Sequence, residues 1–174
     1  TGVQTCALPI LAARRGWLFR GGDVIETAAG LDHVVFDKTG TLTLGRPLVT
    51  DVHGDDPDRL LQLAASLEQS SRHPLAYALL QEAQGRELPL LECHDVRTLS
   101  GQGLEGHVDG APDRVRVGKP DWLLAQGVAM AAAAEGWLAA AEGSVVAVAV
   151  GDRLLGLVQI EDQLRPDVAP ALQR

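Results

Sequence analysis

The chain has 174 residues, of which 46% are hydrophobic, and its 15 basic and 23 acidic residues give a formal net charge of −8. This composition predicts one ordinary folded domain or two small ones sharing an interface, and the scattered basic residues disfavour a nucleic-acid partner. The two cysteines, Cys6 and Cys93, have neither a metal-ligand spacing nor a disulfide pattern, which favours a reducing compartment.

The amino-terminal part of the chain carries few regular patterns. Residues 1–10 have no helical or strand period and no signal-peptide pattern, so they are interpreted as an uncertain lead-in. Residues 23–29 predict one or two helical turns before Gly30. The run Val34 to Phe36 predicts a short buried strand of a parallel sheet, because an apolar run stopped by turn residues is typical of such strands. No window approaches the roughly eighteen apolar residues that a membrane span requires.

The middle and end of the chain alternate between helical and strand periods. Residues 48–52 predict a half-buried strand, Pro57 and Pro74 predict two helix starts, and the Asp109-Gly110 and Gly151-Asp152 pairs predict hairpin turns. The expected elements are helices over 57–67 and 74–84, an antiparallel meander over 92–118, and short helices over 120–126 and 129–142. Two strands over 144–150 and 154–160 follow, and a last helix begins after Arg165-Pro166.

Asp37 follows the apolar run 34–36, at the edge of an α/β sheet where ligands bind. An aspartate before a glycine-containing turn is often only a turn residue. A carboxylate in this place can also act as a nucleophile that accepts a phosphoryl group. Lys38 would offset the phosphate charge, and Thr39, Gly40 and Thr41 would offer hydroxyl and main-chain donors.

The whole stretch DKTGTLT, residues 37–43, resembles the phosphorylation signature of P-type ATPases within the haloacid dehalogenase-like superfamily. The resemblance implies ATP and Mg²⁺ as cofactors, with Asp37 and the main-chain carbonyl of Thr39 as Mg²⁺ ligands and Lys38, Thr39 and Thr41 as catalytic partners of Asp37. Phosphatases of the superfamily typically carry a second aspartate two residues after the nucleophile, as general acid and base. Thr39 stands there instead, which favours a long-lived acyl phosphate and a pump over a phosphatase.

A second stretch, SLEQSSRHPLAYAL over residues 67–80, is similar to the nucleotide-domain signature of the heavy-metal branch of these pumps. It implies that Glu68 and the His73-Pro74 pair help to bind ATP. If Pro74 opens a helix, His73 stands at its cap, where Ser, Thr, Asp or Asn would cap better, so the sequence predicts a role for His73 other than capping. The other histidines, His33, His53, His94 and His107, have no partner at ligand spacing and are interpreted as ordinary strand or loop residues.

Glycine-rich stretches further along extend the resemblance. GQGLEG, residues 101–106, matches the letters of a dinucleotide fingerprint, but a hairpin pattern follows it where that motif needs a helix. Gly101 and Gly103 are therefore either turn glycines or the glycines that bring main chain close to the base. The stretch VGKPDWL resembles the turn that adds Gly118, and less strongly Lys119, to the same pocket. Asp162 and Arg165 are either a local ion pair or part of the return hinge.

The sequence therefore predicts an α/β fold: an incomplete haloacid dehalogenase-like, Rossmann-like phosphorylation domain with an inserted α+β nucleotide-binding domain on an antiparallel sheet. The expected divisions are 1–10 lead-in, 11–47 linker and start of the phosphorylation domain, 48–158 nucleotide-binding domain, and 159–174 return. The downstream magnesium and lysine motifs of the family are expected beyond Arg174.

The resemblance implies ATP-driven heavy-metal transport at the cytoplasmic face of a membrane. Copper is favoured, with zinc or cadmium second, and the transported ion is expected to bind membrane helices outside this chain, which itself holds no transport site. Other expected partners are the actuator and membrane domains of the same protein. Cys6 is not interpreted as a metal ligand, and this part alone is expected to be inactive. A soluble phosphatase and a nucleotide-binding module without turnover remain the alternatives.

Overall fold

The computed structural model describes residues 10 and 12–173, in two compact units divided between Asp37 and Lys38. The predicted lead-in, with Cys6, lies almost entirely outside the described residues. The first unit contains one helix of described bounds, α2 (Gly22–Ala28), in agreement with the turns predicted there. Among the described residues, no helix is both long and apolar enough to cross a membrane.

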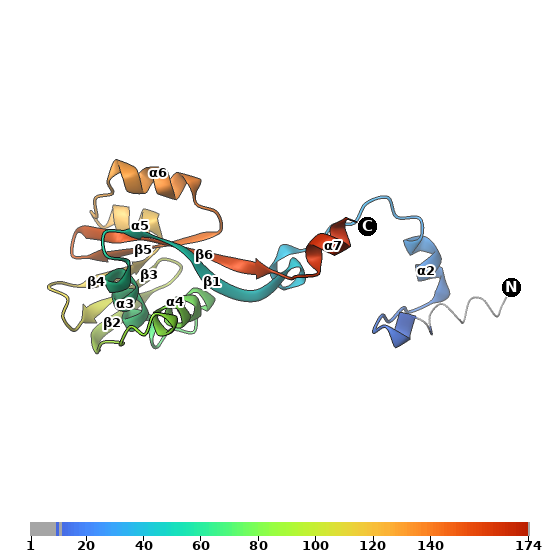
Figure 1. Cartoon of the computed structure of the whole chain (residues 1–174), viewed down its shortest axis with the longest axis horizontal. Coiled ribbons are helices and arrows are strands. Elements are labelled where there is room, and N and C mark those ends of the chain that lie inside the picture. The colour runs from blue at the N-terminus through green and yellow to red at the C-terminus, as the bar shows by residue number, and fades with distance from the viewer. Residues whose placement is uncertain (1–9, 11, 174) are drawn as a thin grey trace. The chain divides into compact units, whose positions relative to one another are not determined.

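The second unit contains a six-stranded sheet with helices on both faces (Figure 1). Its strand order is β1-β6-β5-β4-β3-β2, and every neighbouring pair is antiparallel. The elements in chain order are a kinked turn η1 (Lys38–Leu42), β1 (Thr43–Gly54), α3 (Pro57–Glu68), α4 (Pro74–Gly85), β2 (Cys93–Leu99), β3 (Gly103–Val108), β4 (Val115–Gly118), α5 (Pro120–Ala125), α6 (Ala132–Ala140), β5 (Ser144–Val150), β6 (Arg153–Leu164) and α7 (Val168–Leu172).

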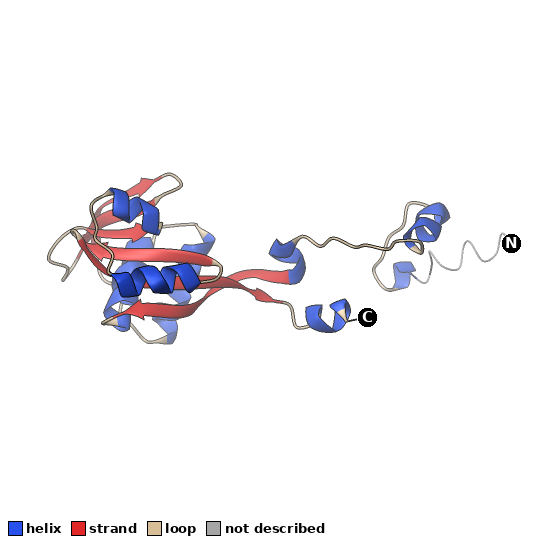
Figure 2. Cartoon of the chain, turned by 90° about the horizontal axis from the view of Figure 1, so that it is seen from above, coloured by secondary structure: helices blue, strands red, loops and turns tan. Residues whose placement is uncertain are grey.

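Alternation along β5 divides the core into two layers. Val146 and Val148 belong to a cluster with the leucines of α3 and α4, whereas Ala147 and Ala149 belong to a second cluster that contains Trp122 of α5. Successive side chains of a strand point to opposite faces, so one strand can serve both layers. Figure 2 shows the helices on either side of the sheet.

Helix α3 begins where the sequence predicts. The carboxylate of Asp56 accepts a hydrogen bond from the main-chain N–H of Arg59 at 3.0 Å, and Pro57 occupies the first turn. Both features favour a helix start. The apolar residues spaced three and four apart along α3 are all buried, as expected for an amphipathic helix against a sheet. They are Leu60, Leu61, Leu63, Ala64 and Leu67.

The antiparallel meander and both hairpins are confirmed. β3 and β4 flank Asp109-Gly110, where Gly110 has a φ of 75°, and β5 and β6 flank Gly151-Asp152, where Gly151 has a φ of 59°. These positive φ values are readily adopted by glycine. The strand predicted over 48–52 is part of the longer β1, which runs without a break through the predicted boundary between 47 and 48, as β6 does between 158 and 159. The division at these residues stays a prediction.

One local prediction is wrong. The buried strand predicted at Val34 to Phe36 is absent: these residues are not in a strand and are 64%, 95% and 47% exposed. A parallel strand needs neighbouring strands to pair with, and the described strands instead pair with one another in an antiparallel sheet that leaves this run out. The helix predicted after Arg165-Pro166 is present as α7, and β6 continues to Leu164 before it.

Candidate functional site

The loop that follows Asp37 has an irregular main chain. Thr39 has φ −75° and ψ 121°, Gly40 has φ 77°, and the side chains of Asp37 and Lys38 are exposed. Thr43, the first residue of β1, is fully buried just behind this loop. Its hydroxyl accepts a hydrogen bond from the Gly40 N–H at 3.1 Å, so the tight part of the loop is fastened to the start of the strand.

Two residues of the returning chain hold the same loop. The Asp162 carboxylate accepts from the Thr43 hydroxyl at 2.5 Å and from the Arg46 N–H at 2.8 Å. The Arg165 main-chain N–H donates to Leu42 O at 2.9 Å, and its guanidinium lies 3.4 Å from Gly40 O. No ion pair between Asp162 and Arg165 occurs among the described residues, so of the two interpretations left open, the contacts match the one in which both residues join the returning strand to the loop.

Thr43 is the residue of this arrangement that sequence reasoning missed. Its position as the last threonine of DKTGTLT was the available signal, but the hydroxyl partner lies 119 residues away in the chain. A bond between residues so far apart becomes visible only when the pairing of β1 with β6 is known.

A pocket between α3, α4 and the meander brings together the residues predicted to bind nucleotide. Its volume of about 290 Å³ lies at the small end of the range of roughly 300–1,000 Å³ found for ligand pockets, so it suits a base better than a whole nucleotide. We call it the Glu68 pocket. Its lining residues are Glu68, Ser71, His73, Leu75, Thr98, Leu99, Gly101, Gln102, Gly103, Leu104, Val117, Gly118, Lys119, Val145 and Val146.

The three glycines of this pocket are needed for different reasons. Gly103 and Gly118 face each other across β3 and β4, and a Cβ on either would lie 2.8 Å from the ring of Trp122 and closer still to main-chain atoms. Packing alone therefore demands glycine at both. Gly101 has a φ of 72°, and a Cβ there would meet nothing within 4 Å, so its side faces open space.

Glu68 brings to the pocket a buried carboxylate oxygen that has no hydrogen-bond partner among the described residues. The residue is 7% exposed, and its Oε2 atom is buried without a hydrogen-bond partner. Burial raises the pKa of the Glu68 carboxyl, while the Ser71 hydroxyl and the charge of His73 act in the opposite direction. A buried acceptor of this kind favours a ligand that offers it an N–H or O–H donor.

His73 occupies the cap of α4, as the sequence predicts for a helix that Pro74 opens. Its Nδ1 accepts a hydrogen bond from the Leu75 N–H at 3.2 Å, so the imidazole does cap the helix. The same ring lines the Glu68 pocket. A local capping role and a pocket role therefore coexist in one side chain.

The family model that matches residues 31–174 is described as haloacid dehalogenase-like hydrolase, and it spans most of the chain. The chain belongs to the haloacid dehalogenase-like hydrolases. The α/β fold predicted from the sequence agrees with this membership.

The chain has relatives among metal-transporting P-type ATPases. It is 42% identical over 166 residues to a probable copper-transporting ATPase of Synechococcus elongatus, covering 94% of this chain and 20% of that protein. It is 37% identical over 169 residues to a manganese-exporting P-type ATPase of Mycobacterium tuberculosis, covering 93% and 23%. A crystal structure of a zinc-transporting PIB-type ATPase matches with 38% identity and a TM-score of 0.76, covering 95% of this chain and 27% of that one. The chain thus spans about a fifth of the curated relatives it matches.

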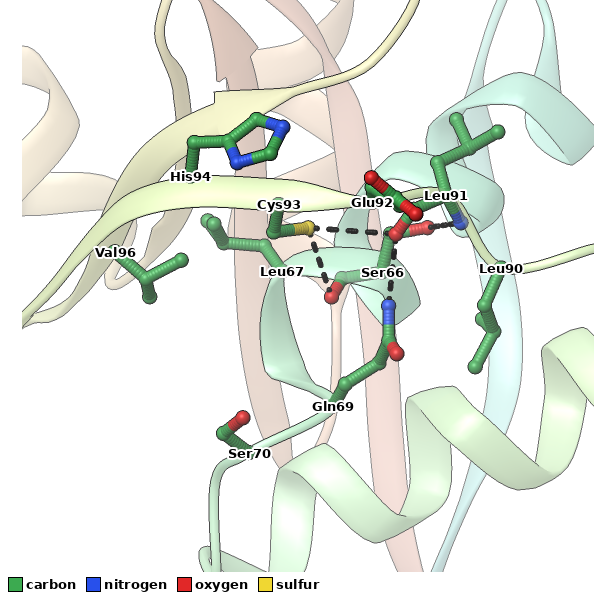
Figure 3. A pocket seen from close by; sticks show the side chains of 10 residues that line it. All are labelled: Ser66, Leu67, Gln69, Ser70, Leu90, Leu91, Glu92, Cys93, His94 and Val96. Carbon is green, nitrogen blue, oxygen red and sulfur yellow. Dashed lines mark hydrogen bonds between the residues drawn. The ribbon is translucent and has the colours of Figure 1, made fainter.

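A second pocket, shown in Figure 3, has a different character. The Ser66 hydroxyl accepts from the Leu91 N–H at 3.0 Å, the Gln69 amide donates to Leu91 O at 2.9 Å, and the Cys93 thiol donates to Ser66 O at 3.2 Å. These bonds join α3 to the segment that enters β2. Ser66, Gln69 and Cys93 thus take part in bonds that hold the fold, whereas Oε2 of Glu68 has no partner among the described residues.

His94 departs from the sequence interpretation, which gave it no partner at ligand spacing. Glu92, His94 and Asp109 are exposed, and their ligand atoms all lie within 4.8 Å of one another. His94 Nε2 is 3.4 Å from Asp109 Oδ1. The contact is a surface pair at the β2 and β3 end of the sheet, away from the residues of the Glu68 pocket.

The buried carboxyl of Glu68 predicts a pH dependence of folding. Because its pKa is raised above the ordinary value of 4.5, the folded chain keeps a proton that the unfolded chain loses as pH rises past that value. Its contribution to stability therefore falls as pH rises through the window between 4.5 and the raised pKa. Glu68→Gln does not titrate, so we expect its free energy of unfolding, relative to wild type, to grow across that window and level off above it.

Urea denaturation from below pH 4.5 to neutral pH measures this difference. Glu142→Gln, at an exposed carboxylate, is the control and should run parallel to wild type. A constant difference between Glu68→Gln and wild type at all pH values would contradict the assigned effect of burial.

Proposed function

We propose that this chain is the ATP-binding and phosphorylated part of a heavy-metal-transporting P-type ATPase. The observation that carries the proposal is the gathering of Glu68, His73 and Gly101 in one base-sized pocket, in the same chain as the DKTGTLT loop. The metal-transporting ATPases among its relatives support the class. ATP held by the Glu68 pocket would phosphorylate Asp37.

In the proposed reaction an oxygen of the Asp37 carboxylate attacks the γ-phosphorus of ATP. The bond between that phosphorus and the bridging oxygen of ADP breaks, and ADP leaves with the electron pair. Lys38 offsets charge on the transferred group, and the Thr39 and Thr41 hydroxyls donate hydrogen bonds to its oxygens. The bond from Gly40 N to Thr43 and the bonds of Asp162 keep the loop in place while this happens.

Magnesium fits the donor set of this loop. The exposed Asp37 carboxylate and the main-chain carbonyl of Thr39 are oxygen ligands of the type that Mg²⁺ prefers. When bound, the ion would neutralise charge on the phosphates and would complete its shell with phosphate and water oxygens. Further protein ligands are proposed to come from outside this chain.

Thr39 supports a pump over the phosphatase alternative. A hydroxyl at that position cannot serve as the general acid and base that a second aspartate supplies, so water attacks the acyl phosphate slowly. A persistent aspartyl phosphate is what a transport cycle needs. A binding module without turnover would not require the nucleophile, the lysine and two threonines in sequence.

For the cargo we propose copper, on the resemblance of the His73 region and of GGDVIE at residues 21–26, with zinc or cadmium as the alternative. The named relatives transport copper, manganese and zinc, so this part of the chain is common to pumps of different metals. The ion would bind membrane helices of the full-length protein. The proposed location is the cytoplasmic face of a membrane, beside actuator and membrane domains of the same protein.

The central test is phosphorylation of Asp37. In the intact protein that carries this chain, γ-labelled ATP should give an acid-stable, hydroxylamine-sensitive label, and Asp37→Asn should abolish it. The same substitution should leave ATP-induced amide shifts over residues 68–118 in place, because the base contacts do not involve Asp37. A label that survives in Asp37→Asn would place the nucleophile elsewhere.

His73 can be tested with two substitutions that differ in capping. His73→Ala removes both roles and should lower the free energy of unfolding by about 1 kcal/mol in addition to weakening ATP binding. His73→Asn keeps a capping acceptor but removes the ring, so we expect an unchanged thermal midpoint and a dissociation constant for ATP roughly five to thirty times higher. Titration calorimetry decides. Unchanged affinity in His73→Asn would leave the residue with capping alone.

Gly101 is the clean test of main-chain approach to the base. Gly103→Val would overlap Trp122 and unfold the meander whatever its effect on binding, so it is uninformative. Gly101→Ala and Gly127→Ala both strain a positive φ in open space, but only Gly101 lines the Glu68 pocket. We expect equal losses of stability, and a loss of ATP affinity of about tenfold, or 1.4 kcal/mol, only for Gly101→Ala. Equal affinities would return Gly101 to the role of a turn glycine.

A further inference from the structure

The Glu68 pocket is large enough for a base, which leaves open where the triphosphate of the nucleotide lies. Its lining includes one side chain with a permanent positive charge, Lys119. A triphosphate carries several negative charges and must extend from the base toward the loop that follows Asp37. The surface between the pocket and that loop is therefore where phosphate-binding groups are expected.

A further pocket is formed by β1 and α4. Gly45, Arg46 and Pro47 of β1 line it from one side, and Pro74 and Tyr77 of α4 line it from the other, around a volume of about 390 Å³. We call it the Arg46 pocket. Pro74 directly follows His73 of the Glu68 pocket, and Gly45 lies three residues after Leu42, the end of the loop. Along the chain, the lining of the Arg46 pocket is therefore next to a residue of the base site and close to the end of the phosphorylation loop.

Two side chains of this pocket are unused by the fold. Tyr77 is 56% exposed, although its neighbours Ala76 and Ala78 on α4 are 0% and 1% exposed. The guanidinium of Arg46 makes no hydrogen bond or ion pair with the described residues, while its main-chain N–H is fixed by Asp162. The fold therefore uses the main-chain N–H of Arg46 and leaves the donors of its guanidinium without a partner among the described residues.

We propose that Arg46 and Tyr77 bind the triphosphate of ATP between the Glu68 pocket and the phosphorylation loop. A guanidinium matches two phosphate oxygens at once, and a phenol hydroxyl donates to a third. The role is specificity and orientation: these residues separate a nucleoside triphosphate from a nucleoside and direct its γ-phosphate toward Asp37. The inference rests on the proposed function, because it takes the Glu68 pocket as the base site.

The test compares ATP with adenosine by titration calorimetry on the full chain. Arg46→Gln should weaken ATP binding roughly fivefold to tenfold and leave adenosine binding unchanged, and Tyr77→Phe should weaken ATP alone by about two- to threefold. Arg46→Lys keeps the charge without the two-pronged donor geometry and should fall between wild type and Arg46→Gln. Arg46→Gln should also show a weaker dependence of ATP affinity on salt.

Arg97→Gln is the matched control. Arg97 is an exposed arginine of β2 that makes no side-chain bond to the described residues and lines none of the three pockets described above, so its removal should change neither affinity. Thermal midpoints identify any variant that fails to fold. If Arg46→Gln fails to fold, Tyr77→Phe still tests the inference, because it removes only a hydroxyl.

The outcomes separate this inference from the proposed function. Equal losses for ATP and adenosine in Arg46→Gln would overturn it, because the residue would then act on the base site. If Arg46→Gln keeps the preference for ATP over adenosine and Lys119→Gln loses it, the inference is overturned and Lys119 is the residue that binds the triphosphate. Wild-type protein that binds neither ligand would remove the proposed base site and this inference together.

Discussion

The pairing of β1 with β6 is the constraint on which the rest of the structure depends. The two strands lie about a hundred residues apart in the chain, and their register runs from Thr43 opposite Leu164 to Gly54 opposite Gly156. At the sheet end the two glycines allow the strands to approach closely: a Cβ on Gly54 would lie 2.6 Å from Leu155 O. At the loop end the bond from Thr43 to Asp162 fastens the strands to the phosphorylation loop. One ribbon of main-chain hydrogen bonds therefore connects the loop with the body that contains the Glu68 pocket.

Within that body, the two pockets that α3 lines differ in how their polar groups are satisfied. Around Ser66 and Cys93, the bonds from the Leu91 N–H to Ser66 and from the Cys93 thiol to Ser66 O join α3 to the chain that enters β2. Glu68 ends the same helix, yet its Oε2 has no partner among the described residues. An unsatisfied buried acceptor costs about 1–3 kcal/mol, so its presence needs a reason beyond folding. A ligand that supplies a donor is a reason that also explains why the carboxyl faces a cavity.

Sequence patterns predicted those parts of the fold that depend on local periodicity. The helix starts at Pro57 and Pro74, the hairpins at Gly110 and Gly151, and the order of strands in the meander all follow from capping, turn chemistry and alternation. What sequence reasoning could not supply depends on distant partners. The run Val34 to Phe36 has the composition of a buried strand, but burial requires neighbours that the described sheet does not provide. The contacts of Thr43 and Asp162, and the Arg46 pocket between β1 and α4, likewise require the tertiary pairing.

Resemblance identified the residues of the Glu68 pocket correctly as neighbours but could not assign a reason to each. The geometry gives each a different reason. Gly103 and Gly118 must be glycine because the Trp122 ring leaves no room for a Cβ, and Gly101 because its φ is positive. His73 both caps a helix and lines the pocket. Residues of one motif can therefore be required by packing, by main-chain conformation or by a ligand. A substitution reports on ligand binding only if it leaves packing and main-chain conformation unchanged. Positions suited to such tests have open space around them or can keep an equivalent capping atom. The free guanidinium of Arg46 meets this condition most fully, because the fold uses its main chain alone.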